Sequence, residues 1–142
     1  SGISHVLFSQ RPEDEAAAID EYLKSLQPVP SPHLVGGRLS PSAERGRLLF
    51  HSDRIACHKC HPASLYTDMK RHSVGTRSPY ETEDRFDTPT LVEVWRTAPY
   101  LHDGRYTTIK ELLAEGEHGL KGRLEELSQE DLDDLVEFVL SL

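Results

Sequence analysis

The sequence predicts an all-α domain whose helices are joined by long loops. Apolar residues recur at helical spacing in several segments, and no segment alternates apolar and polar residues in the way a half-exposed strand does. The stretch from Pro62 to Asp87 is polar and contains Gly and Pro, which is typical of a loop. Because a loop of this length in a small domain usually has a binding role, we expect it to wrap something.

The first expected helix covers residues 12–26, which begin with acidic residues and then carry an apolar stripe. The last expected helix, over residues 128–142, has the same pattern. The stripes are Ile19, Tyr22, Leu23 and Leu26 in the first, and Leu132, Leu135, Val136 and Val139 in the last. Residues 1–27 are therefore predicted to be the tail helix of a truncated upstream domain or an N-terminal extension, although acidic amphipathic helices can look alike without being related.

Residues 28–39 are rich in Pro, Gly and Ser and are predicted to be a linker, so that residues 40–142 form the domain itself. Ser40 is expected to cap a helix with Pro41 at its first position. Gly46 lies inside this helix, where a glycine costs up to about 1 kcal/mol relative to alanine. It indicates close approach of another helix, unless it is simply tolerated.

Three more helix starts are visible further along the chain. Thr88-Pro89 is expected to begin a short helix that ends before Pro99. Thr108 and Glu111 have the spacing of a capping box, and Ser128 is a cap for the last helix.

Composition limits the kinds of partner. The chain has 142 residues, enough for one domain, and only 37% of them are hydrophobic, so a bound apolar cofactor could supply buried area. Its net charge is −8, from 16 basic and 24 acidic residues, which argues against nucleic acid or an anionic membrane as partner. No apolar run is long enough to form a membrane span.

Both cysteines lie in the segment Cys57-His58-Lys59-Cys60-His61, a C-x-x-C-H pattern. Residues three apart on one helical turn lie on the same face, so both sulfurs can form thioether bonds to the vinyl groups of one haem. The adjacent His61 can then bind the iron as the proximal ligand. The pattern predicts one haem c, covalently attached through Cys57 and Cys60.

Three other uses of the cysteines fit less well. A zinc site completed by His72 and His102 would have a spacing that matches no common zinc finger. A redox dithiol would follow a β-strand in a βαβ unit, which the sequence does not predict. A disulfide would leave His61 unexplained. Because haem is attached to C-x-x-C-H segments outside the bacterial cytoplasmic membrane, the motif predicts a periplasmic, cell-surface or secreted bacterial protein.

The far side of the iron has two candidate ligands downstream of the motif. We rank His72 first and Met69 second, with little between them; a second imidazole would lower the reduction potential and a thioether would raise it. An open or water-filled sixth position is a further alternative. His5, His33, His51 and His118 have no supporting pattern and are expected at the surface.

The order of elements resembles the cytochrome c fold: a helix with a glycine, then C-x-x-C-H, then a closing amphipathic helix. In that family the first and last helices cross closely at the glycine. The resemblance therefore implies that Gly46 and Phe50 meet Phe138.

The stretch "FDTPTLVEVWRTAPYLHDGRYTTIKELL", residues 86–113, is more specific. It resembles the C-terminal haem domain of the di-haem cytochrome c peroxidase and MauG superfamily, and the resemblance covers Ser40 to Leu142. Two departures stand out. The chain has one C-x-x-C-H where those peroxidases have two, and Ala98 stands where their domain has a methionine ligand just before the Pro-Tyr pair.

This resemblance implies further haem-contacting residues. Tyr100 is a third candidate ligand, since MauG-like members use a tyrosine near this turn, and His102 is expected to make structural hydrogen bonds. Trp95 flanks the same turn, and Arg96 or Arg105 is expected to bind a haem propionate, although a solvated arginine is an equal alternative.

The expected function is electron transfer through the single haem, as a module of a larger secreted peroxidase-like protein. Its partner would be a redox protein or an upstream haem domain of the same parent chain. One alternative is a haem enzyme of the peroxidase/MauG type, in which this haem lies at or next to the reactive site. Another is a ligand-sensing haem module. Whether the chain is itself an enzyme stays open, and no intrinsic activity is expected if the iron is six-coordinate.

Overall fold

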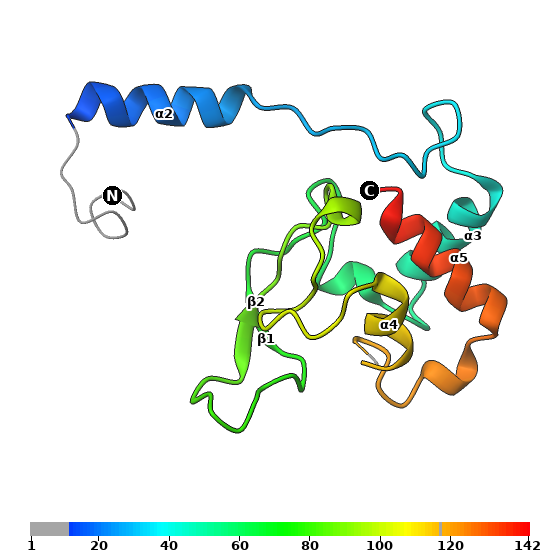
Figure 1. The fold of residues 1–142 in the computed structure, drawn as a ribbon. Helices are drawn as coiled ribbons and strands as arrows, with labels where there is room; N and C mark the ends of the chain where they lie inside the picture. The colour runs from blue at the N-terminus through cyan, green and yellow to red at the C-terminus, as the bar shows by residue number, and fades with distance from the viewer. Residues whose placement is uncertain (1–11, 117) are drawn as a thin grey trace.

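The computed structural model describes residues 12–116 and 118–142, so His5 lies outside the described residues. Helices and short 3-10 turns enclose one core, and long loops pack beside it (Figure 1). The α-helices are α2 (Glu13–Ser25), α3 (Pro41–His51), α4 (Ile109–Ala114) and α5 (Gln129–Leu140). The 3-10 turns are η1 (Cys57–Lys59), η2 (Val94–Arg96) and η3 (Leu124–Glu126), and the strands are β1 (Arg71–Ser73) and β2 (Arg85–Asp87).

The crossing of α3 and α5 organises the core. A Cβ atom built on Gly46 would overlap the backbone carbonyl of Asp134 and would lie 2.9 Å from Cβ of Phe138. Beside this contact the rings of Phe50 and Phe138 meet edge to face, with centroids 5.2 Å apart. The expected helix crossing at Gly46 is confirmed, and so is the meeting of Phe50 with Phe138.

Three helix starts predicted from the sequence are confirmed. The Ser40 hydroxyl accepts a hydrogen bond from the backbone N–H of Ala43, 3.1 Å away. Thr108 and Ser128 each form a full capping box with the residue three positions on. These caps satisfy N–H groups that the first turn of a helix leaves free. Helices α4 and α5 then bury the side chains Ile109, Leu112, Leu113, Leu132, Leu135, Phe138 and Val139.

The all-α prediction is wrong in one detail. Strands β1 and β2 form an antiparallel pair in which His72 lies opposite Phe86. Each strand has three residues, of which only the middle one is half-buried, so neither is long enough to show an alternating pattern.

The predicted helix over residues 88–96 is also shorter than expected, since only η2 forms there. The backbone N–H of Thr88 donates to the carbonyl of Lys70 at 2.9 Å, and the Thr90 hydroxyl donates to the carbonyl of Leu65 at 2.5 Å. These bonds hold residues 88–90 against the loop that follows the C-x-x-C-H motif and compete with helix formation.

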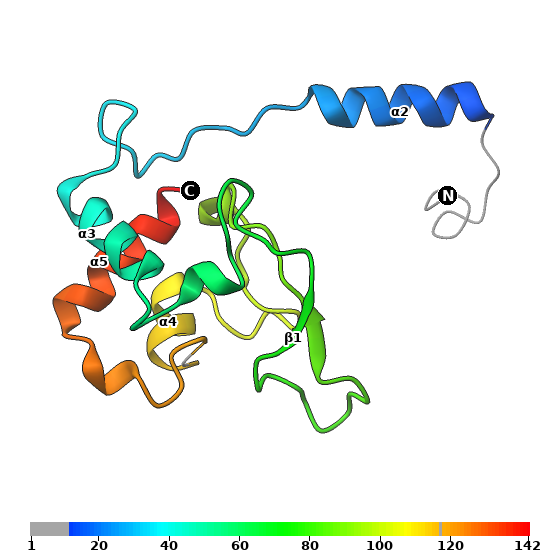
Figure 2. The same ribbon diagram turned by 180° about the vertical axis from the view of Figure 1, so that it is seen from behind.

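Helix α2 forms as predicted but stands apart from the domain in both views (Figures 1 and 2). It buries no residue, and its stripe is exposed, with Tyr22 at 65% and Leu23 at 57%. The linker after it is attached: the Ser31 hydroxyl donates to the Leu140 carbonyl at 2.5 Å, and the Val29 N–H donates to Glu93 at 2.6 Å. Within residues 12–116 and 118–142, no helix combines the length and apolar character that a membrane span requires.

Candidate haem site

The C-x-x-C-H motif forms one tight turn directly after α3. The N–H of Cys60 donates to the carbonyl of Cys57 at 3.2 Å, and the N–H of His61 donates to the same carbonyl at 2.9 Å. Both cysteines and the histidine therefore belong to one hydrogen-bonded turn, as the spacing predicted. No disulfide joins Cys57 to Cys60.

Burial raises the pKa of both cysteine thiols. Cys57 packs against the hydrophobic core, and burial raises the pKa of its thiol to about 11. The pKa of Cys60 is also raised, first by burial and then by the negative charge of Asp68. Both side chains are therefore neutral thiols at pH 7.

The His61 ring is held in place by a hydrogen bond. Its Nδ1 lies 2.8 Å from the backbone carbonyl of Tyr66. A carbonyl only accepts hydrogen bonds, so Nδ1 carries the proton and the lone pair is on Nε2. Burial lowers the pKa of His61, against the opposing effect of this hydrogen bond. A neutral imidazole held through Nδ1–H is the form in which histidine binds metals.

His118 was expected at the surface, but it is half-buried and its Nδ1 is buried. Its ring lies beside His61, with centroids 6.5 Å apart and planes inclined at 59°. Burial, together with the nearby His61, lowers the pKa of His118 to about 4, so its ring is neutral at pH 7. Its position between Gly116 and Gly119 indicates a loop, but no local sequence signal indicates that the ring is buried.

Among the residues that the structure describes, three buried polar side-chain atoms have no hydrogen-bond partner: Thr76 Oγ1, Trp95 Nε1 and His118 Nδ1. Leaving such an atom unsatisfied costs about 1–3 kcal/mol. A haem offers carboxylate oxygens to hydroxyl or indole donors and an iron atom to an imidazole nitrogen. Together with two thiols and the Nε2 lone pair of His61, these unsatisfied atoms fit a covalently attached haem.

The two ranked ligand candidates lie in less suitable surroundings. His72, in β1, is hydrogen-bonded through Nε2 to Asp68 at 2.8 Å, and its side chain is 35% exposed. That hydrogen bond is the main reason why the pKa of Asp68 is lowered to about 2. Met69 is 83% exposed.

The residues implied by the "APYLHDGR" segment lie in defined contacts. Tyr100 is buried, and its hydroxyl donates to the carbonyl of Val94 at 3.0 Å. The His102 ring stacks on Phe86, with centroids 3.7 Å apart, and its Nε2 lies 2.9 Å from a Glu81 carboxylate oxygen. Both residues thus make the protein contacts of structural side chains, and their haem roles stay predictions.

The two arginines also have protein partners. Arg96 donates to Glu93 at 2.6 Å. Arg105 donates to Asp103 at 2.7 Å and to the backbone carbonyl of Thr76 at 2.6 Å. Arg105 therefore holds the chain near the unsatisfied Thr76 hydroxyl, and propionate binding by either arginine stays a prediction.

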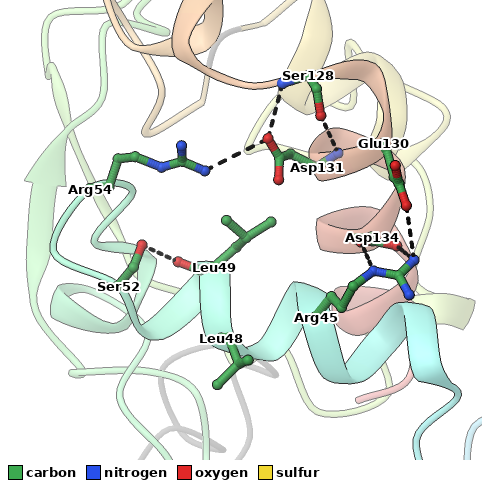
Figure 3. Close-up of a pocket in the computed structure, with 9 residues that line it drawn as sticks. All are labelled: Arg45, Leu48, Leu49, Ser52, Arg54, Ser128, Glu130, Asp131 and Asp134. Carbon is green, nitrogen blue, oxygen red and sulfur yellow. Dashed lines mark hydrogen bonds and ion pairs between the residues drawn. The ribbon is translucent and has the colours of Figure 1, made fainter.

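A cavity of about 490 Å³ lies elsewhere, between α3 and the start of α5 (Figure 3). Arg45 and Asp134 form an ion pair at its edge at 2.6 Å, and Arg54 faces Asp131 at 3.7 Å. None of the C-x-x-C-H residues lines it. We therefore assign it to the charged surface of the helix crossing and not to the haem site.

Comparisons with known proteins find two curated proteins that are similar to parts of this chain. No protein-family model matches the chain. It is 36% identical over 59 residues to hydrazine synthase subunit gamma of Kuenenia stuttgartiensis, an alignment that covers 40% of this chain and 17% of that protein. It is 27% identical over 128 residues to the methylamine utilization protein MauG of Methylorubrum extorquens, covering 73% of this chain and 35% of that protein.

The fold has a solved counterpart. A chain of Kuenenia stuttgartiensis hydrazine synthase, solved under xenon pressure, superposes with a TM-score of 0.78 at 25% identity, covering 99% of this chain and 59% of that chain. The relationship to MauG is weak and partial. This chain spans about a sixth to a third of the length of the curated relatives it matches.

Proposed function

We propose that this chain is a mono-haem electron-transfer module, with haem c attached through Cys57 and Cys60 and with His61 as the proximal ligand. The observation that carries the proposal is the hydrogen-bonded turn in which both thiols are followed by an imidazole that has its lone pair on Nε2. The buried Trp95 Nε1–H and Thr76 hydroxyl, which have no hydrogen-bond partner, support an acceptor that the described residues do not provide.

The haem supplies a one-electron couple between ferric and ferrous iron. The protein's part is to hold and tune this group. The Tyr66 carbonyl accepts the Nδ1 proton of His61, which fixes the ring and makes it a stronger donor, and a stronger donor stabilises the ferric state. Cys57 packs against the hydrophobic core, which would limit the access of water to a haem attached there.

The proposal includes a location and a partner. Because haem is attached to C-x-x-C-H segments outside the cytoplasm, we place the protein in the bacterial periplasm, at the cell surface or outside the cell. An electron carrier needs a second redox centre, either in a separate protein or in an upstream haem domain of the same parent chain. The net charge of −8 favours a basic docking surface on that partner.

The test is a ligand-binding spectrum of the holoprotein, matured in a bacterial host with periplasmic haem attachment. We expect a low-spin, six-coordinate iron in both redox states that ignores carbon monoxide and cyanide and is reduced and reoxidised reversibly. A control without the proximal imidazole, His61→Ala, should lose the low-spin spectrum. A high-spin ferric iron in the wild type that binds cyanide readily would contradict electron transfer as the function.

A second candidate is a haem enzyme of the peroxidase/MauG type. It is favoured by the similarity to MauG, a methylamine utilization protein, and to a hydrazine synthase, both of which are longer than this chain. Peroxide added to the ferric holoprotein distinguishes the two. If the spectrum changes rapidly with one equivalent of peroxide and a reducing substrate is consumed, the protein is an enzyme. An unchanged spectrum supports an electron-transfer module.

A further inference from the structure

We propose that His118, and not His72 or Met69, is the distal ligand of the haem iron, so that His61 and His118 bind it from opposite sides. This inference rests on the proposed function, since it concerns the same haem. It assigns a role to a residue that the sequence pattern did not single out.

The separation of the two rings is the first argument. Two imidazoles bound to opposite sides of one metal, each through a bond of about 2.0–2.1 Å, have ring centres roughly 6–6.5 Å apart. The centroids of His61 and His118 are 6.5 Å apart. The spacing of the two rings is therefore compatible with one iron atom between them.

The second argument is the unsatisfied nitrogen. Nδ1 of His118 is buried and has no hydrogen-bond partner. A buried polar atom without a partner is costly, and a metal bond to the ring nitrogen is a way to satisfy it. The rival candidates have no such need, because His72 is bonded to Asp68 and Tyr100 is bonded to the Val94 carbonyl, while Met69 is exposed.

The third argument is that the loop carrying His118 is anchored to the haem-attachment segment. Arg123 donates to the backbone carbonyls of Arg54 and Ile55, at 3.1 and 3.3 Å, just before the C-x-x-C-H turn. Leu120, which lies between His118 and Arg123 in the sequence, is completely buried in the core. In both views α4 and the start of this loop lie next to the turn (Figures 1 and 2).

The end of α4 fixes where the loop begins. A Cβ atom at Gly116 would come within 2.8 Å of the Tyr106 ring, so the absence of a side chain lets the chain pass close to that ring. The N–H of His118 then donates to the carbonyl of Leu112 at 3.4 Å. The loop is thus fixed on both sides of His118, which keeps the ring in place before any metal binds.

The experiment compares His118→Ala with the matched control His72→Ala, both as matured holoproteins that carry covalent haem. We expect the ferric spectrum of His118→Ala to be high spin and the variant to bind carbon monoxide and cyanide. Added imidazole should restore the low-spin spectrum. His72→Ala and Met69→Leu should keep the wild-type spectrum. A low-spin His118→Ala protein, or loss of the low-spin spectrum in either control, would overturn the proposal.

A second measurement covers the case in which His118→Ala fails to mature. Near-infrared magnetic circular dichroism and electron paramagnetic resonance of the wild type distinguish two imidazoles from imidazole–methionine and imidazole–tyrosine ligation. A two-imidazole signature that persists in His72→Ala supports His118, and any other ligand pair overturns it. If wild-type protein carries no haem at all, the proposed function itself fails, whereas a haem protein with another distal ligand removes only the assignment of His118.

Discussion

Asp134 places a buried carboxylate at the crossing of α3 and α5. The Arg45 guanidinium donates to it through two nitrogens at 2.6 and 2.7 Å, and the Ser42 hydroxyl donates at 2.5 Å. The bonds from Arg45 are the main reason why the pKa of Asp134 lies below its usual range. A carboxylate this well satisfied stabilises the fold in its ionised form.

We expect Asp134→Asn to lower the free energy of unfolding by about 1.5–3 kcal/mol at pH 7, the usual worth of hydrogen bonds to a charged group. A lowered folded-state pKa adds stability that is present above the unfolded-state pKa of about 3.9 and is lost as pH falls through the folded-state value. The gap between wild type and variant, measured by denaturant unfolding, should therefore shrink below about pH 4.

The matched control for this prediction is Asp133→Asn, one residue away. Asp133 is 52% exposed and pairs with Lys110 at 2.7 Å. Exposed pairs contribute about 0–1 kcal/mol, so the control should change stability little. An equal loss in both variants, or a gap for Asp134→Asn that does not depend on pH, would contradict the role given to Asp134.

Single residues also show how far the sequence could predict the site. Cys57, Cys60 and His61 lie close together in the sequence, so one local turn fixes them. Their spacing alone was therefore enough to predict this turn. The position of His118 depends on the path of a loop 57 residues further on, which is set by the burial of Leu120 and the backbone contacts of Arg123. No local pattern encodes those long-range contacts, so its burial was missed.

At the scale of elements, the α3–α5 crossing is the contact that holds the first and last parts of the domain together. We expect Gly46→Ala to destabilise the holoprotein by about 1–3 kcal/mol or more, because the added methyl group forces the two helix backbones apart. Thermal unfolding followed in the far ultraviolet measures this. The control is Leu48→Ala in the same helix. Leu48 is 64% exposed, so this variant should change the stability little. A stable Gly46→Ala protein would show that the helices do not touch there.

Helix α2 is the opposite case. It has 13 residues and buries none, and isolated helices of that length are marginal in water. Removing residues 1–27 should therefore leave the thermal midpoint and the haem spectrum unchanged. A longer deletion of residues 1–39 also removes the contacts of Val29 and Ser31 and should lower the midpoint. A clear drop with the shorter deletion would mean that α2 packs against the domain.

The sequence predicted elements well where a cap defines the start, as at Ser40, Thr108 and Ser128. It failed where distant segments compete for the same backbone. Residues 88–90 bond to residues 65 and 70 in place of their own helix, and β1 pairs with β2 across a long loop. Such pairings depend on tertiary contacts, which a periodicity of a few residues cannot reveal.

For the molecule as a whole, the net charge of −8 predicts salt-dependent association. Opposite charges speed the encounter of two proteins, and the Debye length falls from about 30 Å at 0.01 M to about 8 Å at 0.15 M ionic strength. The rate of electron exchange with a basic redox protein, followed by stopped-flow absorbance, should therefore fall as salt is added. With an acidic redox protein the rate should rise. A salt-independent rate with both partners would contradict electrostatic docking.

The low share of hydrophobic residues is in line with the proposal at this scale, because a covalently bound haem would supply apolar area that the side chains do not. The account as a whole depends on the covalent attachment of haem to Cys57 and Cys60. The most direct test is the intact mass of matured protein under denaturing conditions, for wild type and for Cys57→Ala/Cys60→Ala. We predict the mass of the polypeptide plus one haem for wild type and of the bare polypeptide for the double variant. A wild-type mass equal to the bare polypeptide would contradict the account.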